Sequence, residues 1–352
     1  MSNTFGRLLR LTSWGESHGP AIGGVLDGCP AGIVISEQEM QKDLDRRRPG
    51  QSNITTMRDE PDAVKILSGV FEGKTTGAPI GFIIENKDKN SASYAKIKDI
   101  YRPGHADYTM DQKYGFRDWR GGGRTSARET AVRVAAGAVA KKIIDGVKIT
   151  GYTVQIGEIK ISGVDHAEIE KNLVRAPDAE AARKMIELIE KVRKDGDSVG
   201  GMVEVVVENA PAGLGAPVYG KLNADIASAM MGINAVKGVE IGSGFKCASM
   251  RGSEHNDQLE SVNGKLRFKT NNAGGILGGI SNGDRIVVRI AVKPTPSILI
   301  EQEAVNKNLE NTRISVEGRH DPCICPRVVP VAEAMMALVL ADHLLLQRTS
   351  QI

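Results

Sequence analysis

The chain has 352 residues, of which 41% are hydrophobic and 25% are charged, and its formal net charge at pH 7 is +3. These values are typical of a soluble globular protein with enough chain for one large domain or two smaller ones. The nearly balanced charge and an aromatic content of 4% argue against a general nucleic-acid-binding protein, which needs a strongly basic face and stacking platforms.

Cysteine usage and the N-terminus favour a cytoplasmic protein. The four cysteines, at 29, 247, 323 and 325, do not make a disulfide framework in a chain this long, so reduced thiols are expected. Cys323 and Cys325 have no second close pair of Cys or His at zinc-ligand spacing, and no metal site is predicted. The first residues contain no apolar signal region.

The first 50 residues predict short strands followed by one helix. Apolar runs separated by tight turns predict strands at 7–12, 21–27 and 33–35. Ser36 is the expected N-cap of a helix over 37–47, which Pro49-Gly50 ends. Arginines 46–48 then lie at the helix C-terminus, where they either complement the helix dipole or bind phosphate; the pattern leaves both open.

Two further strands, 63–71 and 79–85, are predicted around a glycine-rich turn. Segment 69–75 nearly matches a phosphate-binding P-loop, but it is one residue short and is followed by Gly-Ala-Pro instead of a helix. A P-loop nucleotidase is therefore disfavoured. The polar segment 86–100 is expected to form an exposed loop.

The stretch 117–130 combines closely spaced arginines, three consecutive glycines and the start of a helix. Ser126 and Glu129 have the spacing of a capping box, and apolar residues continue at helical spacing to Ile143. Free amides at a helix start beside a glycine run favour phosphate binding. A solvated basic loop ahead of a capped helix is the alternative that spacing alone leaves open.

The rest of the chain mixes strands and helices without the regular alternation of a doubly wound fold. Strands are expected at 149–161, 202–207 and 286–292, and helices at 178–194 and 222–231. Glycine-rich segments 232–244 and 271–283 do not fit the dinucleotide fingerprint. The apolar segment 328–346 contains charged residues, which favours a buried or interface helix over a membrane span. We predict an α+β fold, and the lack of a linker favours a single domain over 1–352.

Three histidines lie in glycine-containing turns: His18, His105 and His320. Because imidazole exchanges protons near neutral pH, they are candidates for general acid catalysis, although a lone histidine is more often structural. Asp321 lies in a constrained turn and is a candidate base; a plain Asx-turn is an equally good interpretation.

Seven stretches together resemble the chorismate synthase family. Three of them are Gly15-Glu-Ser-His-Gly-Pro-Ala-Ile-Gly-Gly-Val-Leu-Asp-Gly-Cys-Pro30, Arg120-Gly-Gly-Gly-Arg-Thr-Ser-Ala-Arg-Glu-Thr130 and Gly318-Arg-His-Asp-Pro-Cys323. Segments 46–50, 102–107, 233–242 and 274–279 also match, in family order. The resemblance therefore covers nearly the whole chain.

The resemblance implies a lyase that converts 5-enolpyruvylshikimate 3-phosphate to chorismate and phosphate. The reaction is a 1,4-elimination with no net redox change that nevertheless requires reduced FMN. A phosphate leaving an allylic carbon needs positive charge and a proton donor, and a weakly acidic ring hydrogen needs a strong acceptor. The implied fold is a β-α-β sandwich in which two antiparallel sheets are enclosed by helices, assembled as a homotetramer.

The resemblance also implies roles for individual residues. His18 would protonate the departing phosphate, His105 would hold or supply the flavin's proton, and Asp321 would assist proton removal at flavin N5. Guanidinium groups suited to the substrate's phosphate and carboxylates belong to Arg47, Arg102 and Arg128. The implied flavin-binding residues are Arg124, Thr125, Ser126, Asn234, Ala235, Gly278, Lys293, Pro294, Thr295, Pro296, Ser297 and Arg319.

One departure from the family pattern concerns the reductant. The family often has arginine after Pro49-Gly50, where this chain reads Gln51-Ser52-Asn53, so direct handling of NADPH is in doubt. We expect the flavin to arrive reduced by an external partner, and we expect neither nucleic acid nor membrane as a partner. The rival hypothesis is a flavin- or nucleotide-binding module without catalysis, which would not need two histidines and an aspartate together.

Overall fold

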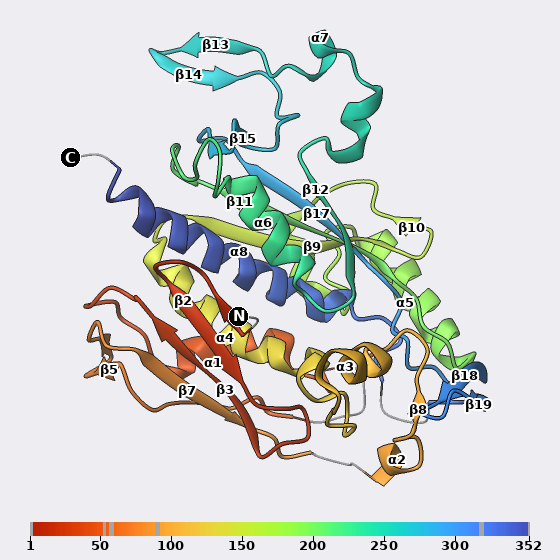
Figure 1. Cartoon of the computed structure of the whole chain (residues 1–352). Helices are drawn as coiled ribbons and strands as arrows, with labels where there is room; N and C mark the ends of the chain where they lie inside the picture. The colour runs from red at the N-terminus through yellow and green to blue at the C-terminus, as the bar shows by residue number, and fades with distance from the viewer. Residues whose placement is uncertain (1–2, 52–53, 56–59, 89–91, 317–319, 351–352) are drawn as a thin grey trace.

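The computed structural model describes residues 3–51, 54–55, 60–88, 92–316 and 320–350. Two five-stranded sheets form the frame of the molecule (Figure 1). Every strand pairing in both sheets is antiparallel. Together with the helices described below, this confirms a mixed helix and strand content.

The first sheet has the order β1-β2-β3-β7-β4. Its strands are β1 (Thr4–Phe5), β2 (Arg10–Trp14), β3 (Ala21–Asp27), β7 (Ile80–Glu85) and β4 (Val64–Ile66). In β7, alternate residues Ile80, Phe82 and Ile84 are buried, as expected when one face of a strand packs on a core.

The second sheet has the order β10-β9-β11-β17-β12. Its strands are β10 (Ile159–Lys160), β9 (Lys148–Ile156), β11 (Gly201–Glu208), β17 (Ile286–Val292) and β12 (Val236–Ile241). The same alternation buries every second residue of β17. A single cluster of buried apolar side chains includes residues of both sheets.

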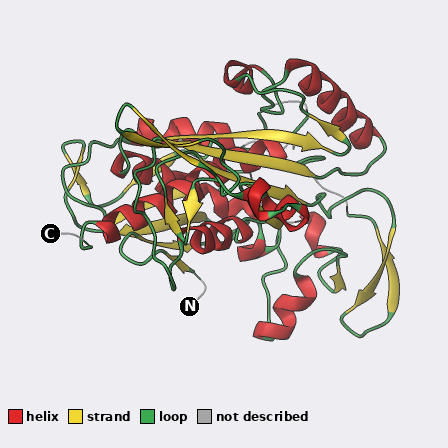
Figure 2. Ribbon diagram, turned by 90° about the horizontal axis from the view of Figure 1, so that it is seen from above, coloured by secondary structure: helices red, strands yellow, loops and turns green. Residues whose placement is uncertain are grey.

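The longest buried helices lie between the sheets. α4 (Thr130–Ile143) packs on β2 and β3 of the first sheet, α8 (Cys325–Gln347) packs on β9 and β11 of the second, and the two helices pack on each other. Figures 1 and 2 show these layers from two directions. The resemblance implied that helices enclose the two sheets, whereas α4 and α8 lie between the sheets. α8 is buried nearly all round, so only an interior position suits it.

α8 is also long and apolar enough to span a membrane, but 89% of its most apolar window is buried inside the protein. The sequence-based prediction of a buried helix is therefore confirmed. The remaining helices are α1 (Glu37–Arg47), α2 (Ala92–Ala95), α3 (Asp107–Tyr114), α5 (Ala179–Lys194), α6 (Leu222–Met231) and α7 (Gly252–His255).

The structure also contains smaller sheets besides the two five-stranded sheets. They are the three-stranded sheet β19 (Asn311–Ile314), β18 (Gln302–Asn306) and β8 (Ile100–Tyr101), and the hairpins β5 (Val70–Phe71) with β6 (Lys74–Thr75), β13 (Leu259–Val262) with β14 (Lys265–Phe268) and β15 (Ile276–Leu277) with β16 (Ile280–Ser281). The near-P-loop segment forms the β5–β6 hairpin, which confirms that it lacks the helix a P-loop requires.

Candidate active site

A cleft of about 540 Å³ lies where segments from distant parts of the chain meet. Its lining includes most of the residues singled out in the sequence, namely His18, Arg47, Arg102, His105, Thr125, Ser126, Arg128, Asn234, Ala235, Lys293, Thr295, Pro296, Ser297 and Asp321. Such a concentration of polar side chains in one large cleft makes it the candidate active site.

Three described residues singled out in the sequence are not part of this lining, namely Arg124, Gly278 and Pro294. Arg124 lines an adjoining cavity of about 360 Å³, which shares Thr125 and Asn234 with the cleft. Gly278 lies in the turn between β15 and β16, and Pro294 lies between two lining residues without contributing to the lining. Arg319 falls outside the described residues.

Hydrogen bonds tie together the three segments expected to bind flavin. Asn234 Nδ2 donates to the carbonyl of Thr125 at 3.0 Å, and the amide of Lys293 donates to the carbonyl of Ala235 at 2.9 Å. Ala235 has a positive φ of 68°, a conformation that non-glycine residues adopt rarely and often near functional sites. The three segments therefore form one wall of the cleft.

The ring of His18 is oriented by its neighbours. Ser17 Oγ donates to the carbonyl of Gly121 at 3.0 Å and lies 3.1 Å from His18 Nδ1. Because the hydroxyl hydrogen is committed to Gly121, Ser17 accepts a hydrogen bond from Nδ1–H. Nε2 is then the nitrogen through which His18 can exchange a proton with a ligand.

His105 is neutral at neutral pH. Its Nδ1 lies 3.0 Å from the carbonyl of Pro103, which can only accept, and its Nε2 lies 2.8 Å from Ser297 Oγ. Nδ1 therefore carries the hydrogen, and Nε2 accepts from Ser297. Burial, assisted by the positive charge of Arg102, lowers the pKa of His105 to about 4.

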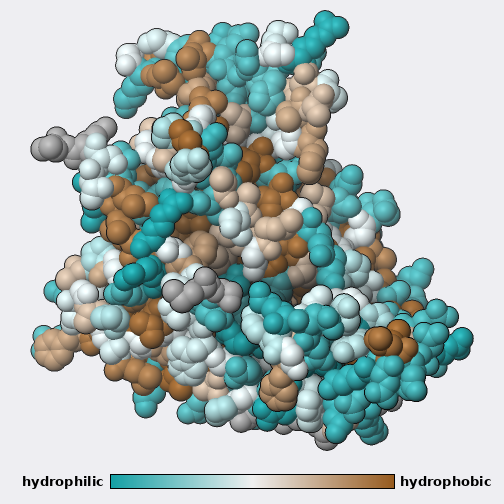
Figure 3. Space-filling view, in the orientation of Figure 1, coloured by the Kyte–Doolittle hydropathy of each residue, from teal (hydrophilic) through white to brown (hydrophobic). Residues whose placement is uncertain are grey.

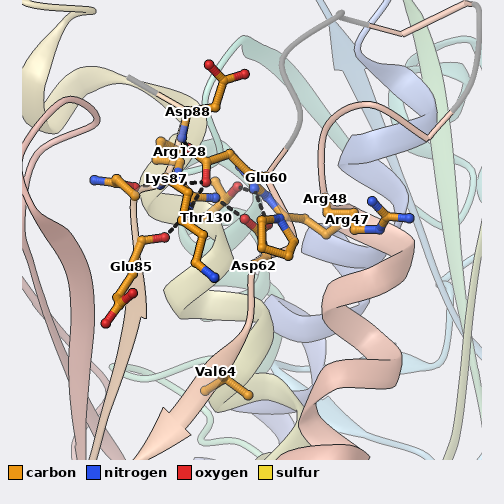
Figure 4. Close-up of polar contacts among 12 residues, drawn as sticks. Arg47, Arg48, Glu60, Asp62, Val64, Glu85, Lys87, Asp88, Arg128 and Thr130 are labelled. Atoms are coloured by element: carbon orange, nitrogen blue, oxygen red, sulfur yellow. Dashed lines mark hydrogen bonds and ion pairs between the residues drawn. The ribbon is translucent and has the colours of Figure 1, made fainter. Parts of the chain in front are cut away.

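The arginines lining the cleft are held by carboxylates of the protein. Arg102 makes a bidentate pair with Asp107, with Nε and Nη2 at 2.7 and 2.8 Å from its oxygens. Arg47 and Arg128 both pair with the buried Asp62 (Figure 4). A bidentate or bridging pair holds the plane of a guanidinium in one orientation, so the cations of this site are preorganised.

The stretch 117–130 differs from its prediction at the helix start. Two 3-10 turns, Gly123–Thr125 and Ala127–Glu129, precede α4, and Ser126 Oγ accepts from the amide of Arg128 instead of Glu129. The Glu129 carboxylate pairs with Arg133 at 2.7 Å, so the predicted capping box is wrong. The 3-10 turns also use amides that an open helix start would offer to an anion.

Arg327 is a charged cleft residue that was not chosen from the sequence. It lies two residues into α8 and pairs with Asp321. His320, a general-acid candidate from its glycine-containing turn, also lines the cleft, but burial and the charge of Arg102 lower its pKa to about 4. No sequence signal marked Arg327.

Three polar atoms of cleft residues have no hydrogen-bond partner within the described parts of the chain. They are Asn234 Oδ1, Thr295 Oγ1 and His320 Nε2, and all three are buried. Buried polar atoms are rarely left unsatisfied in native proteins. A ligand with several donors and acceptors, such as a flavin ring, suits this lining.

Comparison with known proteins identifies one family over nearly the whole chain. A sequence model described as chorismate synthase matches residues 9–345. Chorismate synthase of Roseiflexus castenholzii is 56% identical over 352 residues, covering 99% of this chain and 98% of that protein. Chorismate synthase of Methylorubrum populi is 57% identical over 356 residues, covering 98% of this chain and 97% of that protein.

A solved structure agrees as well. A crystal structure of chorismate synthase matches with a TM-score of 0.77 and 35% sequence identity, covering 97% of this chain and 93% of that chain. Because the sequence match and the structural match both span nearly the whole chain, the protein belongs to the chorismate synthase family, a family of shikimate-pathway lyases.

Proposed function

We propose that the protein converts 5-enolpyruvylshikimate 3-phosphate to chorismate and phosphate by 1,4-elimination, with reduced FMN bound in the cleft. In this reaction the C–O bond to phosphate breaks, a ring C–H bond breaks, and a new C=C bond forms. The observation that carries the proposal is the convergence of His18, His105 and Asp321 on one cleft with ion-paired arginines.

The cleft suits a flavin on the chemistry of its lining. Segments 125–126, 234–235 and 293–297 would hold it, and the unpartnered oxygens of Asn234 and Thr295 would face its polar edge. Reduced FMN would supply electron density for phosphate expulsion and an acceptor for the ring hydrogen. The cleft would contribute orientation, charge and proton transfer around the two reacting positions.

His18 would act as the acid toward the leaving phosphate. Since its Nδ1–H is held by Ser17, its conjugate acid would donate from Nε2, and reprotonation would occur at the same atom. Neutral His105, whose Nε2 accepts from Ser297, would pass a proton through that hydroxyl. Asp321, held by Arg327, would accept a proton on the flavin side.

Arginines would neutralise the substrate's phosphate and carboxylates. Arg102 presents the clearest donor group because Asp107 uses its Nε and Nη2 and no bond to Nη1 is seen among the described residues. Arg47 and Arg128 would contribute charge from beneath, since their side chains are 2% and 3% exposed.

An anaerobic assay with chemically reduced FMN tests the proposal. Wild-type protein with 5-enolpyruvylshikimate 3-phosphate is expected to release phosphate and form chorismate, and the same mixture with oxidised FMN is expected to do neither. Absence of product from well-folded protein with reduced FMN would refute the function.

The rival, a binding module without catalysis, predicts a different outcome for His105→Ala. A lyase is expected to retain flavin binding and to lose roughly 100-fold or more in turnover, as is typical when an acid-base group is removed. A variant that turns over at the wild-type rate would contradict the role proposed for His105. Flavin binding is measured separately by fluorescence quenching.

The reduced flavin is proposed to come from an external reductant. Gln51, in the stretch where the family often has arginine, is engaged internally: its Nε2 donates to the carbonyl of Arg46 at 2.9 Å, and its Oε1 accepts from Arg175. We therefore expect negligible turnover in air with FMN and NADPH alone. Sustained chorismate formation under those conditions would contradict this part of the proposal.

We also propose that the protein is a cytoplasmic homotetramer. An arm formed by residues 244–268, which include α7, β13 and β14, projects from the body and carries exposed apolar side chains (Figures 1 and 3). Phe245, Leu259 and Leu266 are 78%, 57% and 65% exposed. Grouped apolar exposure of this kind is typical of surfaces that another chain covers.

A further inference from the structure

Arg47 and Arg128 meet at one buried carboxylate beneath the cleft (Figure 4). Asp62 Oδ2 accepts from Arg47 Nη1 at 2.8 Å, and Asp62 Oδ1 accepts from Arg128 Nη1. The Asp62 side chain is 0% exposed. A single anion thus joins the C-terminal end of α1 to the turn that precedes α4.

The backbone around Asp62 is built to keep this anion in place. Asp62 has a φ of 48°, which is uncommon for a residue with a side chain. Two residues earlier, the buried Glu60 accepts from the amides of Lys87 and Asp88 at 3.0 and 3.1 Å. Backbone strain that the surroundings maintain is a feature of functional sites.

The other contacts of the two arginines complete their orientation. Arg47 Nε donates to Thr130 Oγ1 at 3.1 Å and Nη2 donates to the carbonyl of Ala127 at 2.7 Å, while Arg128 Nε donates to Asn86 Oδ1 at 2.8 Å. Each terminal nitrogen of a guanidinium carries two hydrogens, so these contacts leave donors for a ligand.

Charge explains why the carboxylate is needed. Burial lowers the pKa of Arg47 to about 10, an effect that Asp62 opposes and that Arg327 and Arg128 strengthen. Burial alone would raise the pKa of Asp62, but the two guanidinium groups hold it below its ordinary value. Without Asp62, Arg47 would lose its carboxylate partner, and Arg128 would keep the more distant Glu60, at 4.0 Å.

We propose that Asp62 is a positioning residue for substrate binding, which holds Arg47 and Arg128 at the separation and orientation that receive the substrate's anionic groups. The inference rests on the proposed function, because it takes the substrate to be a polyanion that binds in this cleft. In this role Asp62 itself would contact neither the substrate nor the flavin.

Asp62→Asn tests the proposal because it removes the charge and nearly preserves the shape. We expect the dissociation constant for 5-enolpyruvylshikimate 3-phosphate to rise by roughly 10- to 100-fold, and kcat at saturation to fall by a smaller factor, because Asp62 acts on binding through the two arginines and touches no reacting atom. Inorganic phosphate, titrated by calorimetry, is expected to show weaker binding as well.

Glu333→Gln provides a matched control. Glu333 is the buried partner of Arg46, the residue next to Arg47 on α1, and neither Glu333 nor Arg46 lines the cleft. Both variants are expected to lower Tm, since each neutralises a buried carboxylate that pairs with arginine, although Arg46 keeps Glu170 as a second partner. Only Asp62→Asn is expected to weaken binding. A dissociation constant equal to that of wild type, or a lower one because Asp62 competes with substrate, would overturn the proposal.

Asp62→Glu keeps the test informative if the first variant does not fold. It retains the charge and moves the carboxylate by one methylene group. Positioning predicts substrate binding several-fold weaker than wild type, whereas wild-type binding in this variant would overturn it. Wild-type protein that binds substrate without forming chorismate would instead contradict the proposed function, and the comparison of dissociation constants would still stand.

Discussion

At the scale of single residues, the site depends on side chains held by atoms far away in the sequence. The turn histidines and Asp321 were recognisable because their residue types and glycine settings indicate proton transfer. Asp62 was not recognisable, because its partners are 15 and 66 residues away and no local pattern marks a bridging carboxylate. A sequence reveals a chemical group more readily than the group that orients it.

The imidazole of His18 can occupy its observed position only because residue 121 is glycine. A Cβ added at Gly121 would lie 1.9 Å from His18 Nδ1 and 2.8 Å from Ser17 Oγ, and its φ is +61°. We predict that Gly121→Ala displaces the imidazole and reduces kcat by roughly 100-fold, the typical contribution of one acid-base group.

Gly115→Ala is the control for backbone strain at Gly121. Gly115 has a φ of +69°, but an added Cβ would meet nothing within 4 Å. It should therefore lose stability of about 1 kcal/mol from the left-handed backbone alone and keep its activity. Full activity in Gly121→Ala would show that His18 does not need its observed position.

The partly buried histidines His105 and His320 predict how stability depends on pH. Burial, with the charge of Arg102, lowers the pKa of His105 and of His320 from 6.5 to about 4. The unfolded chain therefore binds more protons between these values, so stability is complete above about pH 6.5 and falls as pH decreases toward 4. We expect a loss on the order of 1–3 kcal/mol per histidine over this window.

Thermal unfolding between pH 7 and pH 4.5 checks this prediction. Carboxylates whose pKa is lowered, such as Asp62 and Asp107, contribute loss of stability only below about pH 4. The His105→Gln variant should lose part of the pH dependence and His320→Gln another part. A wild-type Tm that is constant over this range, or slopes unchanged in both variants, would contradict neutral imidazoles.

At the scale of elements, prediction succeeded where caps or periodicity were strong. The bounds of α1, α6, β3 and β17 are those predicted, and Ser36 caps α1 by accepting from the amide of Glu39. α3 was missed because its only buried side chain is Asp107, which packs through an ion pair with Arg102 and not through an apolar face. β12 was missed because glycine-rich sequence gives little strand signal.

The contact between α4 and α8 makes a prediction at this scale. A Cβ on Gly137 of α4 would lie 2.4 Å from the Cβ and 2.7 Å from the Cα of Ala334 on α8. Alanine improves helix propensity by about 1 kcal/mol, but overpacking against backbone costs about 1–3 kcal/mol. We therefore expect Gly137→Ala to lower Tm.

Adding Ala334→Gly to Gly137→Ala separates the two effects. The second substitution removes the nearer of the clashing atoms, so the double variant should recover part of the lost Tm. A single variant with raised Tm would mean that the helices separate freely, and the close packing described for this layer would be wrong.

At the scale of the whole molecule, the two sheets and the helices between them bring distant segments to one cleft. The mixed fold class followed from the irregular alternation of strands and helices. The order of the layers did not, because an apolar helix such as α8 indicates burial without indicating which sheet covers it. The segments of the cleft meet through long-range contacts such as Asn234 with Thr125.

The reaction proposed for this protein is an elimination that needs reduced FMN but consumes none of it. The most direct test is an anaerobic reaction with excess 5-enolpyruvylshikimate 3-phosphate over enzyme-bound reduced FMN, with chorismate, phosphate and flavin absorbance followed together. We expect one phosphate for each chorismate over many turnovers, with the flavin still reduced at the end. Product limited to one equivalent per flavin, with the flavin oxidised, would contradict it, and so would phosphate release without chorismate.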